Sequence, residues 1–139
     1  MPVRYLLDTN TASYVIKGNF PRVRERLMKT QMAEVGISVI TEAELRFGVA
    51  RKPAAVKLRT AIEEFLLRVE TLPWDSEAAQ QYGQIRAALE RVGQPMGNLD
   101  MMIAAHSLAL AAVLVTNNTR HYERIPAPLM LQDWSEPAP

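Results

Sequence analysis

Cysteine is absent from all 139 residues of the chain. This excludes disulfide scaffolds, thiolate metal sites and cysteine nucleophiles, and it agrees with a reducing compartment. An excess of charge is absent too, because the formal net charge is only +1. Bulk electrostatics therefore argue neither for nor against a nucleic-acid partner, and evidence for one must come from a particular site.

Long apolar runs are also missing. The longest, residues 101–115, is interrupted by His106 and Ser107 and is shorter than the roughly 18 residues that cross a bilayer. We interpret it as a buried helix that leads into a buried strand. The opening residues, MPVRYLLDTN, lack the apolar core of a signal peptide. We therefore expect a cytoplasmic protein without membrane contact.

The composition that is present, 48% hydrophobic and 22% charged, suits one globular domain over residues 1–139. Buried-strand patterns alternate with helical patterns along it. The expected strands are 3–7, 35–40, 69–72, 113–116 and a short fifth at 129–131. The expected helices are 12–17, 21–30, 42–50, 53–68, 77–92 and 99–111. This alternation predicts a three-layer α/β fold, with a mostly parallel sheet of four to five strands covered by helices on both faces.

Three carboxylates stand where the strands or their following helices meet one edge of that sheet. Asp8 ends the first strand, Glu44 opens the helix after the second, and Asp100 lies in the first turn of the helix that feeds the fourth. Each has an ordinary alternative role. Asp8 could cap a helix, Glu44 could pair with the expected cap Thr41 in a capping box, and Asp100 could favour the helix dipole. Because ligand crevices lie beyond the carboxyl ends of parallel strands, we expect the three to share one crevice.

Three carboxylates in one crevice repel one another unless a cation compensates them. Oxygen ligands without histidine or cysteine suit Mg²⁺ or Mn²⁺, and neither histidine has the spacing of a zinc motif. The chain also contains no G-x-S-x-G elbow, no G-x-G-x-x-G loop and no Walker sequence. The sequence therefore predicts a magnesium or manganese site.

Helix geometry separates the candidate acid Glu44 from its neighbour Glu42. Residues two apart project to nearly opposite sides of a helix. Glu42 precedes Arg46 by four residues and can form a surface ion pair, whereas Glu44 has Gly48 one turn on, which leaves space. We assign Glu44 to the site. By the same geometry His106, six residues after Asp100, faces away from it and is expected to be structural.

Five segments follow one another in a familiar order. They are LLDTN, ISVITEAELRFG, YGQIRAALERVG, GNLDMMIAAHSLA and LVTNNTRHYERI, followed by a late DW. Together, from about Tyr5 to Trp134, they resemble the PIN-domain ribonucleases of the VapC toxin type. The resemblance implies an α/β fold, metal-dependent endoribonuclease activity and a role as the toxin of a type II toxin–antitoxin pair.

The family pattern also implies site residues. Its first acid, in the LDTN segment, matches Asp8, its second matches Glu44, and its third, before the IAAH helix, matches Asp100. Many relatives carry a fourth acid after the VT-N strand, where this chain has Asn118. That departure removes one negative charge, although an amide oxygen can still ligate Mg²⁺ or orient water.

As a mechanistic hypothesis, the three acids bind Mg²⁺ or Mn²⁺, a bound water attacks the phosphodiester, and Asp8 or Glu44 helps to remove the proton. Asn10 and Thr116 are expected to organise the site through hydrogen bonds rather than to ligate the metal.

RNA is expected to be held largely through its phosphates. Arg22, Arg26 and Lys29 are spaced to share one helix face. Arg86 is a further candidate that could equally pair with Glu90. A second basic group comprises Arg51, Lys52, Lys57 and Arg59. Each of these side chains has the alternative of a solvated surface position.

Partners are implied by the resemblance alone. They are a cognate antitoxin that covers the metal crevice, a second copy in a toxin homodimer, a toxin–antitoxin hetero-oligomer, and operator DNA bound only through the antitoxin. Two other classes of function stay open: a non-catalytic PIN module that binds RNA or protein, and a DNA nuclease on the same fold.

Overall fold

The central sheet is parallel throughout. A computed structural model describes residues 2–137 of the chain. Its strands are β1 (Tyr5–Leu7), β2 (Val35–Ser38), β3 (Glu70–Leu72), β4 (Val113–Val115) and β5 (Leu131–Gln132). They lie in the order β3-β2-β1-β4-β5, and every neighbouring pair is parallel. The predicted α/β fold with a parallel sheet is confirmed. The expectation of one domain extends to residues 1, 138 and 139, which lie outside the described residues, and it stays a prediction.

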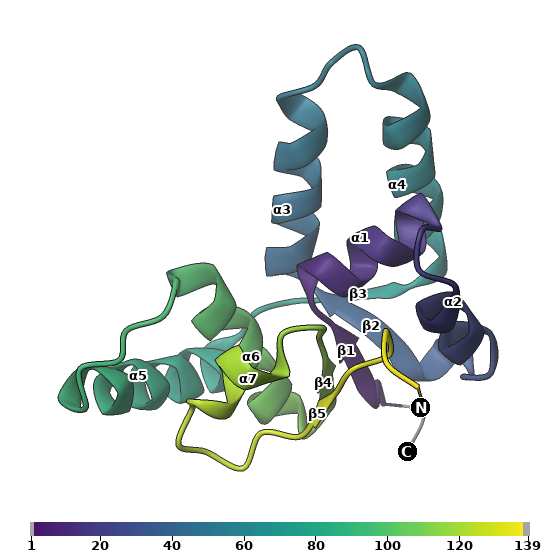
Figure 1. Cartoon of the computed structure of the whole chain (residues 1–139). Coiled ribbons are helices and arrows are strands. Elements are labelled where there is room, and N and C mark those ends of the chain that lie inside the picture. Colours follow the sequence, from purple (N-terminus) through teal and green to yellow (C-terminus); the bar gives the residue numbers. More distant parts are fainter. Residues whose placement is uncertain (1, 138–139) are drawn as a thin grey trace.

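Helices cover both faces of this sheet and make three layers (Figure 1). They are α1 (Thr9–Lys17), α2 (Pro21–Met28), α3 (Val39–Ala50), α4 (Val56–Arg68), α5 (Ser76–Arg91), α6 (Asn98–Leu110) and α7 (Thr119–Glu123), with a 3₁₀ turn at Met32–Glu34. Helices α1 to α4 pack on one face and α5 to α7 on the other. Among residues 2–137, no helix is both long and apolar enough to cross a membrane.

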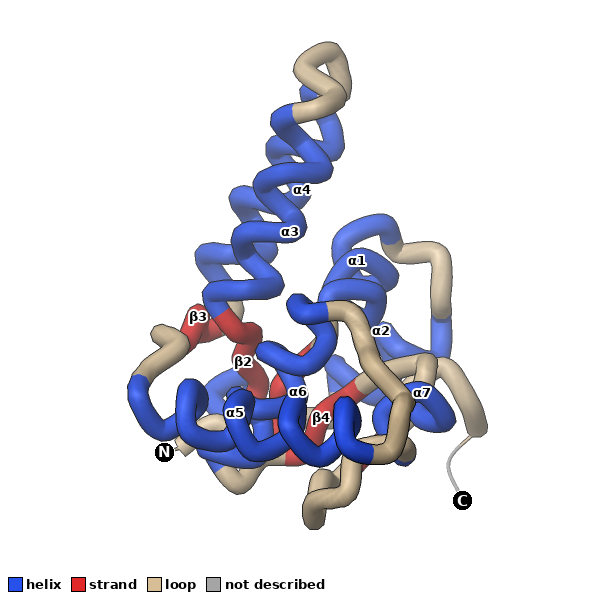
Figure 2. Tube along the Cα trace, turned by 90° about the vertical axis from the view of Figure 1, so that its left-hand side faces the viewer, coloured by secondary structure: helices blue, strands red, loops and turns tan. Residues whose placement is uncertain are grey.

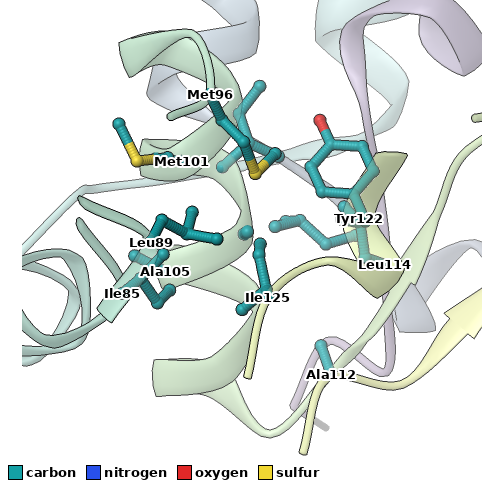
Figure 3. Close-up of a cluster of buried hydrophobic side chains, with 12 residues drawn as sticks. Ile85, Leu89, Met96, Met101, Ala105, Ala112, Leu114, Tyr122 and Ile125 are labelled. Atoms are coloured by element: carbon teal, nitrogen blue, oxygen red, sulfur yellow. The ribbon is translucent and has the colours of Figure 1, made fainter. Parts of the chain in front are cut away.

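Adjacent residues of β1 belong to opposite cores, because successive strand side chains point to opposite faces. Leu6 packs with α5, α6 and α7 in the cluster of Figure 3, which includes Leu114 and Tyr122. Leu7 packs with helices α1 to α4 and with the buried Trp134. Both faces of the short strands are therefore buried, as near-continuous apolar runs in a parallel sheet require.

Helices α3 and α4 project from the body as a helical hairpin (Figures 1 and 2). Midway along the hairpin, Arg46 pairs with Glu42 at 2.7 Å and with Glu63 of α4 at 2.7 Å. The predicted ion pair between Glu42 and Arg46 is thus confirmed. These exposed ion pairs contribute only about 0.2–1 kcal/mol each, so packing holds the hairpin together.

The predicted end of the second strand was wrong. Strand β2 stops at Ser38, whose hydroxyl accepts a hydrogen bond from the backbone N–H of Ile40 at 3.1 Å and caps α3. Thr41 was expected to be the cap, but it is buried inside the first turns of the helix. The expected capping box with Glu44 therefore does not form, and the carboxylate of Glu44 has another partner.

Other boundaries shift by one to three residues. Helix α1 begins at Thr9 rather than residue 12, because Asp8 itself is the cap, and α4 begins at Val56 rather than residue 53. Helix α6 begins at Asn98 rather than residue 99, and Gly97 precedes it. Two residues, Asp75 and Ser76, suit the cap of α5 by their position in the sequence, and Asp75 is the one that fills it, since its carboxylate accepts from the N–H of Ala78 at 3.1 Å.

Candidate active site

The strand order places a crevice at the carboxyl edge of β1. The chain runs from β1 outward through β2 to β3, and then returns to add β4 and β5 on the other side of β1. The connection that leaves β1 leads to β2 on one side, and the connection that leaves β4 leads to β5 on the other, so the two diverge between β1 and β4. Such a switch point is where parallel α/β sheets bind ligands. Residues 8–10 leave the sheet at this point.

Asp8 is fixed by its own backbone and by the helix that it caps. Its N–H donates to the carbonyl of Val115 at 2.9 Å, which extends the pairing of β1 with β4. Its carboxylate Oδ1 accepts from the backbone N–H of Thr11 at 2.8 Å. The expected role as a helix cap is therefore real, yet the residue is only 5% exposed. A surface cap does not need such burial.

Burial raises the pKa of Asp8, because the charged form loses its hydration. Hydrogen bonds from Thr116 and Thr11 act in the opposite direction, and the nearby carboxylate of Asp100 adds to the rise. The pKa of Asp8 thus records both the burial and the repulsion between two of the three predicted acids. A bound cation is the kind of group that would relieve both.

Glu44 reaches the crevice from the base of the projecting hairpin. Its Oε1 accepts from the hydroxyl of Thr9 at 2.6 Å, and the hydroxyl oxygens of Thr9 and Thr41 lie 3.2 Å apart. A Cβ added at Gly48 would meet nothing within 4 Å, so the space predicted beside Glu44 is open. The two threonines therefore hold the carboxylate next to the start of α1.

Asp100 enters the crevice from the first turn of α6. Its Oδ2 lies 3.0 Å from Nε2 of His121, which belongs to α7. The imidazole is partly buried, whereas the Asp100 side chain is more accessible. The histidine thus orients one acid of the site from a segment that follows β4.

Tyr122, the neighbour of His121, closes the floor of the same crevice. It is buried in the α5–α7 core, and its hydroxyl lies at the edge of that core (Figure 3). Burial and the negative charges of Asp100 and Asp8 raise the pKa of the phenol well above its usual value. The hydroxyl stays protonated at neutral pH and lies near the carboxylate of Asp100.

One cavity of about 90 Å³ unites these groups. Its lining consists of Asp8, Thr9, Asn10, Glu44, Asp100, Asn118, His121 and Tyr122. In their present orientations, however, no three acidic or imidazole side chains within residues 2–137 are close enough together to hold a metal ion. The hydrogen bonds of Glu44 to Thr9 and of Asp100 to His121 direct these two carboxylates to separate partners.

The donor chemistry nevertheless fits a hard divalent cation. All three acids offer oxygen, the ligand that Mg²⁺ and Mn²⁺ prefer, and the burial of Asp8 penalises a negative charge that a cation would neutralise. Ligation by all three acids requires the side chains of Glu44 and Asp100 to turn toward Asp8.

The predicted supporting residues surround the cavity in different ways. Asn10 and Asn118 line it, and both are exposed. Thr116 lies behind it, fully buried, where its hydroxyl accepts from the N–H of Asn118 at 3.0 Å and lowers the pKa of Asp8. An organising role for Thr116 agrees with these contacts.

The basic candidates have partners of their own. Arg26 donates to the side chain of Gln132 at 3.2 Å and stacks over Trp134. Arg86 bonds Glu90 at 3.0 Å and the hydroxyl of Tyr82 at 3.0 Å. Arg22 and Lys29 are exposed. None of these four cations lines the cavity.

His106 is structural, as predicted. It is buried, and its Nδ1 lies 2.8 Å from the hydroxyl of Ser38. Burial lowers the pKa of this imidazole, which favours the neutral form. It therefore ties α6 to the end of β2 and takes no part in the cavity.

The sequence interpretation missed Thr9, His121 and Tyr122 as site residues. Thr9 was not assigned to the site, although it directly follows Asp8. The His-Tyr pair lies three residues after Asn118, and a short helix after β4 would have placed it near the same edge. That spacing was the available signal, but the segment NTRHYE was not interpreted as helical.

The fold and this site together define a class of protein. The family model described as "PIN domain" matches residues 5–127. The chain therefore belongs to the PIN-domain family, and the resemblance noted in the sequence is confirmed.

Within the family, the chain is similar to VapC proteins along nearly its whole length. It is 40% identical over 132 residues to the tRNA(fMet)-specific endonuclease VapC of Salmonella typhimurium, covering 95% of this chain and 98% of that protein. It is 35% identical over 135 residues to the ribonuclease VapC2 of Rickettsia felis, with coverages of 95% and 98%. The crystal structure of DNA-bound VapBC from Salmonella typhimurium superposes with a TM-score of 0.88 at 40% identity, over 95% of this chain and 98% of that chain.

Proposed function

We propose that this protein is the toxin of a type II toxin–antitoxin pair and that it acts as an endoribonuclease. The observation that carries the proposal is the buried carboxylate of Asp8, which shares one polar cavity with Glu44 and Asp100 at the carboxyl edge of the sheet. Similarity to ribonucleases over 95% of the chain supports RNA as the substrate.

Asp8, Glu44 and Asp100 would hold Mg²⁺ or Mn²⁺. When bound, such a cation polarises a phosphoryl oxygen and makes a water molecule more acidic. Asp8 follows β1, Glu44 belongs to α3 and Asp100 belongs to α6. The cation would therefore join elements from both faces of the sheet.

The remaining chemistry belongs to the side chains. Either Asp8 or Glu44 accepts the proton of the attacking water, because both carboxylates line the cavity. The Thr9 hydroxyl keeps Glu44 at the cavity, and Tyr122 and His121 do the same for Asp100. Asn10 and Asn118, exposed at the rim, offer amide groups to a phosphate or a water.

The substrate proposed for the first assay is tRNA(fMet). The relative from Salmonella typhimurium carries that specificity in its name and shares 40% of its residues with this chain. The protein partner is a cognate antitoxin that covers the cavity and joins the toxin to operator DNA, since a similar structure is DNA-bound VapBC. A homodimer of the toxin completes the proposed assembly.

The test is cleavage by purified protein with a matched inactive variant. tRNA(fMet), a mixed RNA pool and single-stranded DNA of the same sequence are each incubated with Mg²⁺, with Mn²⁺ or with EDTA. We expect cleavage of RNA alone, its loss in EDTA, and its loss in Asp100→Asn prepared in parallel. RNA cleavage that survives both EDTA and Asp100→Asn would contradict the metal site. Cleavage of DNA in preference to RNA would identify a DNA nuclease instead of a ribonuclease.

A further inference from the structure

Two stacked aromatic rings lie beside the carboxylate cavity. Tyr14 of α1 and Phe20, which precedes α2, have ring centroids 3.9 Å apart and planes 27° apart. Phe20 is nevertheless 37% exposed, so the residue stays partly accessible to solvent. The two rings lie where α1 leads into α2, and these helices are neighbours in the fold (Figure 1).

The stack is continuous with the rim of the cavity. Asn10 lines the cavity, and Tyr14 lies four residues later on α1, about one turn or 5.4 Å along the same helix face. Asn117 precedes the cavity residue Asn118, and its Nδ2 donates to the hydroxyl of Tyr14 at 2.7 Å. Tyr14, Phe20 and Asn117 are here called the aromatic ledge.

Positive charge flanks the ledge. Lys17 lies in the last turn of α1 and Arg22 in the first turn of α2, on either side of Phe20 in the sequence. Both side chains are exposed, and neither belongs to an ion pair within residues 2–137. Cations beside an accessible aromatic ring are the usual composition of a single-stranded nucleic-acid site, where phosphates meet the charges and bases stack on the ring.

We propose that the aromatic ledge is a base-binding subsite for single-stranded RNA. An unpaired base stacks on the accessible part of Phe20, and the strand continues past Asn117 and Asn10 into the carboxylate cavity. This inference rests on the proposed ribonuclease function and adds a contact outside the reacting centre. Because every base has a π-face, the ledge positions the RNA strand relative to the cavity without selecting a particular base.

A purely structural role makes a different prediction. If the Tyr14–Phe20 stack only closes the α1–α2 corner, then leucine at position 20 retains the apolar contact and changes nothing in RNA binding. If a base stacks on Phe20, leucine removes the π-face and weakens binding, whereas tyrosine preserves it. The pair Phe20→Leu and Phe20→Tyr therefore separates packing from stacking.

The experiment measures binding without cleavage. In an Asp100→Asn background with Mg²⁺ present, the Kd of short unstructured RNA oligonucleotides is measured by fluorescence anisotropy, for Phe20→Leu, Phe20→Tyr and the unchanged ledge. The oligonucleotides carry 2-aminopurine, whose fluorescence is quenched on stacking, or a single abasic position moved along the strand. We expect Phe20→Leu to raise Kd about tenfold and to lose quenching, with Phe20→Tyr within about twofold of the unchanged ledge. With the abasic position at the ledge, the difference between leucine and phenylalanine should vanish.

A second measurement does not depend on the leucine variant folding. RNA containing 5-iodouridine is photocrosslinked to the protein with the unchanged ledge, and the crosslinked peptide is mapped by mass spectrometry. A crosslink to Tyr14 or Phe20 supports the ledge. Three results would overturn it. One is a set of crosslinks confined to other peptides, and another is an equal Kd for the leucine and phenylalanine proteins. The third is a leucine variant that keeps RNA binding and loses only its antitoxin complex. If wild-type protein cleaves RNA while the ledge tests fail, only the ledge is wrong. If wild-type protein neither binds nor cleaves RNA, the proposed function itself fails.

Discussion

The starts of helices α1 and α5 use the same capping arrangement in different surroundings. Asp8 accepts from the N–H of Thr11 at 2.8 Å, and Asp75 accepts from the N–H of Ala78 at 3.1 Å. Asp75 is exposed, whereas Asp8 is buried at the switch point beside another acid. The local hydrogen bond is therefore common to a structural and a candidate catalytic aspartate. Burial and the neighbouring charge distinguish them.

The largest expected difference between the two caps is in activity. Asp8→Asn retains an oxygen for the cap but loses the charge, so we expect RNA cleavage to fall by about 10³-fold. Asp75→Asn should stay within about twofold of wild type. Single-turnover cleavage rates of the two variants test this difference. Equal rates would show that Asp8, like Asp75, only caps its helix.

Glu44 and Glu42 repeat the comparison within α3. Glu44 lies at the cavity, and Glu42 is held by Arg46 at 2.7 Å on the surface. We expect Glu44→Gln to lower cleavage by about 10²-fold and Glu42→Gln to leave it unchanged. Cleavage rates of both variants at the same Mg²⁺ concentration check the assignment of Glu44 to the site. A lower rate in Glu42→Gln alone would assign Glu42 instead.

His121 should have a smaller effect, because it orients Asp100 without being one of the three acids. We expect His121→Ala to lower kcat about tenfold with little change in KM, and His121→Gln to recover most of the loss through its amide nitrogen. Glu123→Ala, an exposed change on the same helix, serves as the control. Identical kinetics for the alanine and glutamine variants would argue against positioning.

The smallest effect concerns stability and has the opposite sign. Since the pKa of Asp8 is raised in the folded protein, its ionised form costs folding free energy above that raised pKa and nothing below the unfolded value of about 3.9. Without added metal, Asp8→Asn should therefore stabilise the protein at pH 7 by about 1 kcal/mol, or roughly 3 °C in Tm. The gain should shrink as pH falls through the raised pKa toward about 4.

Thermal unfolding scans at several pH values measure this gain, with Asp75→Asn as the reference. Mg²⁺ should raise the Tm of wild type more than that of Asp8→Asn, because binding to the folded state stabilises it. If Asp8→Asn is less stable than wild type at pH 7, the free energy gained from hydrogen bonds to the ionised carboxylate exceeds the free-energy cost of burying its charge.

The sequence was sufficient for the sheet and for the acids that follow from it. Alternating strand and helix patterns predicted a mostly parallel sheet, although not the order of its strands, and the end of a buried strand at Asp8 predicted a polar group at the sheet edge. The family resemblance selected the same acids independently. These inferences depend on patterns along the chain and on one general property of parallel sheets.

The helix starts could not be predicted as well, because two capping residues compete near β2. Ser38 and Thr41 both suit a cap, and the apolar run through Ile40 fits either a longer strand or a helix that begins at residue 39. The two alternatives are separated only by the tertiary surroundings of these residues: Val39 is 38% exposed, and Ile40 is partly buried against the core formed by α5 to α7. Likewise, the contact of His121 with Asp100 depends on α7 folding back over α6, and no local pattern encodes that long-range placement.

The strand order has a consequence for synthesis of the chain on the ribosome. Strand β1, which ends in Asp8, is made first, but its neighbour β4 is made more than a hundred residues later, after Asp100. A nascent chain that has emerged only as far as β3 leaves one side of β1 without a partner and lacks Asp100 and Thr116. The complete carboxylate edge therefore forms only after residues 113–116 have left the ribosome, which delays any activity of the proposed site until that point.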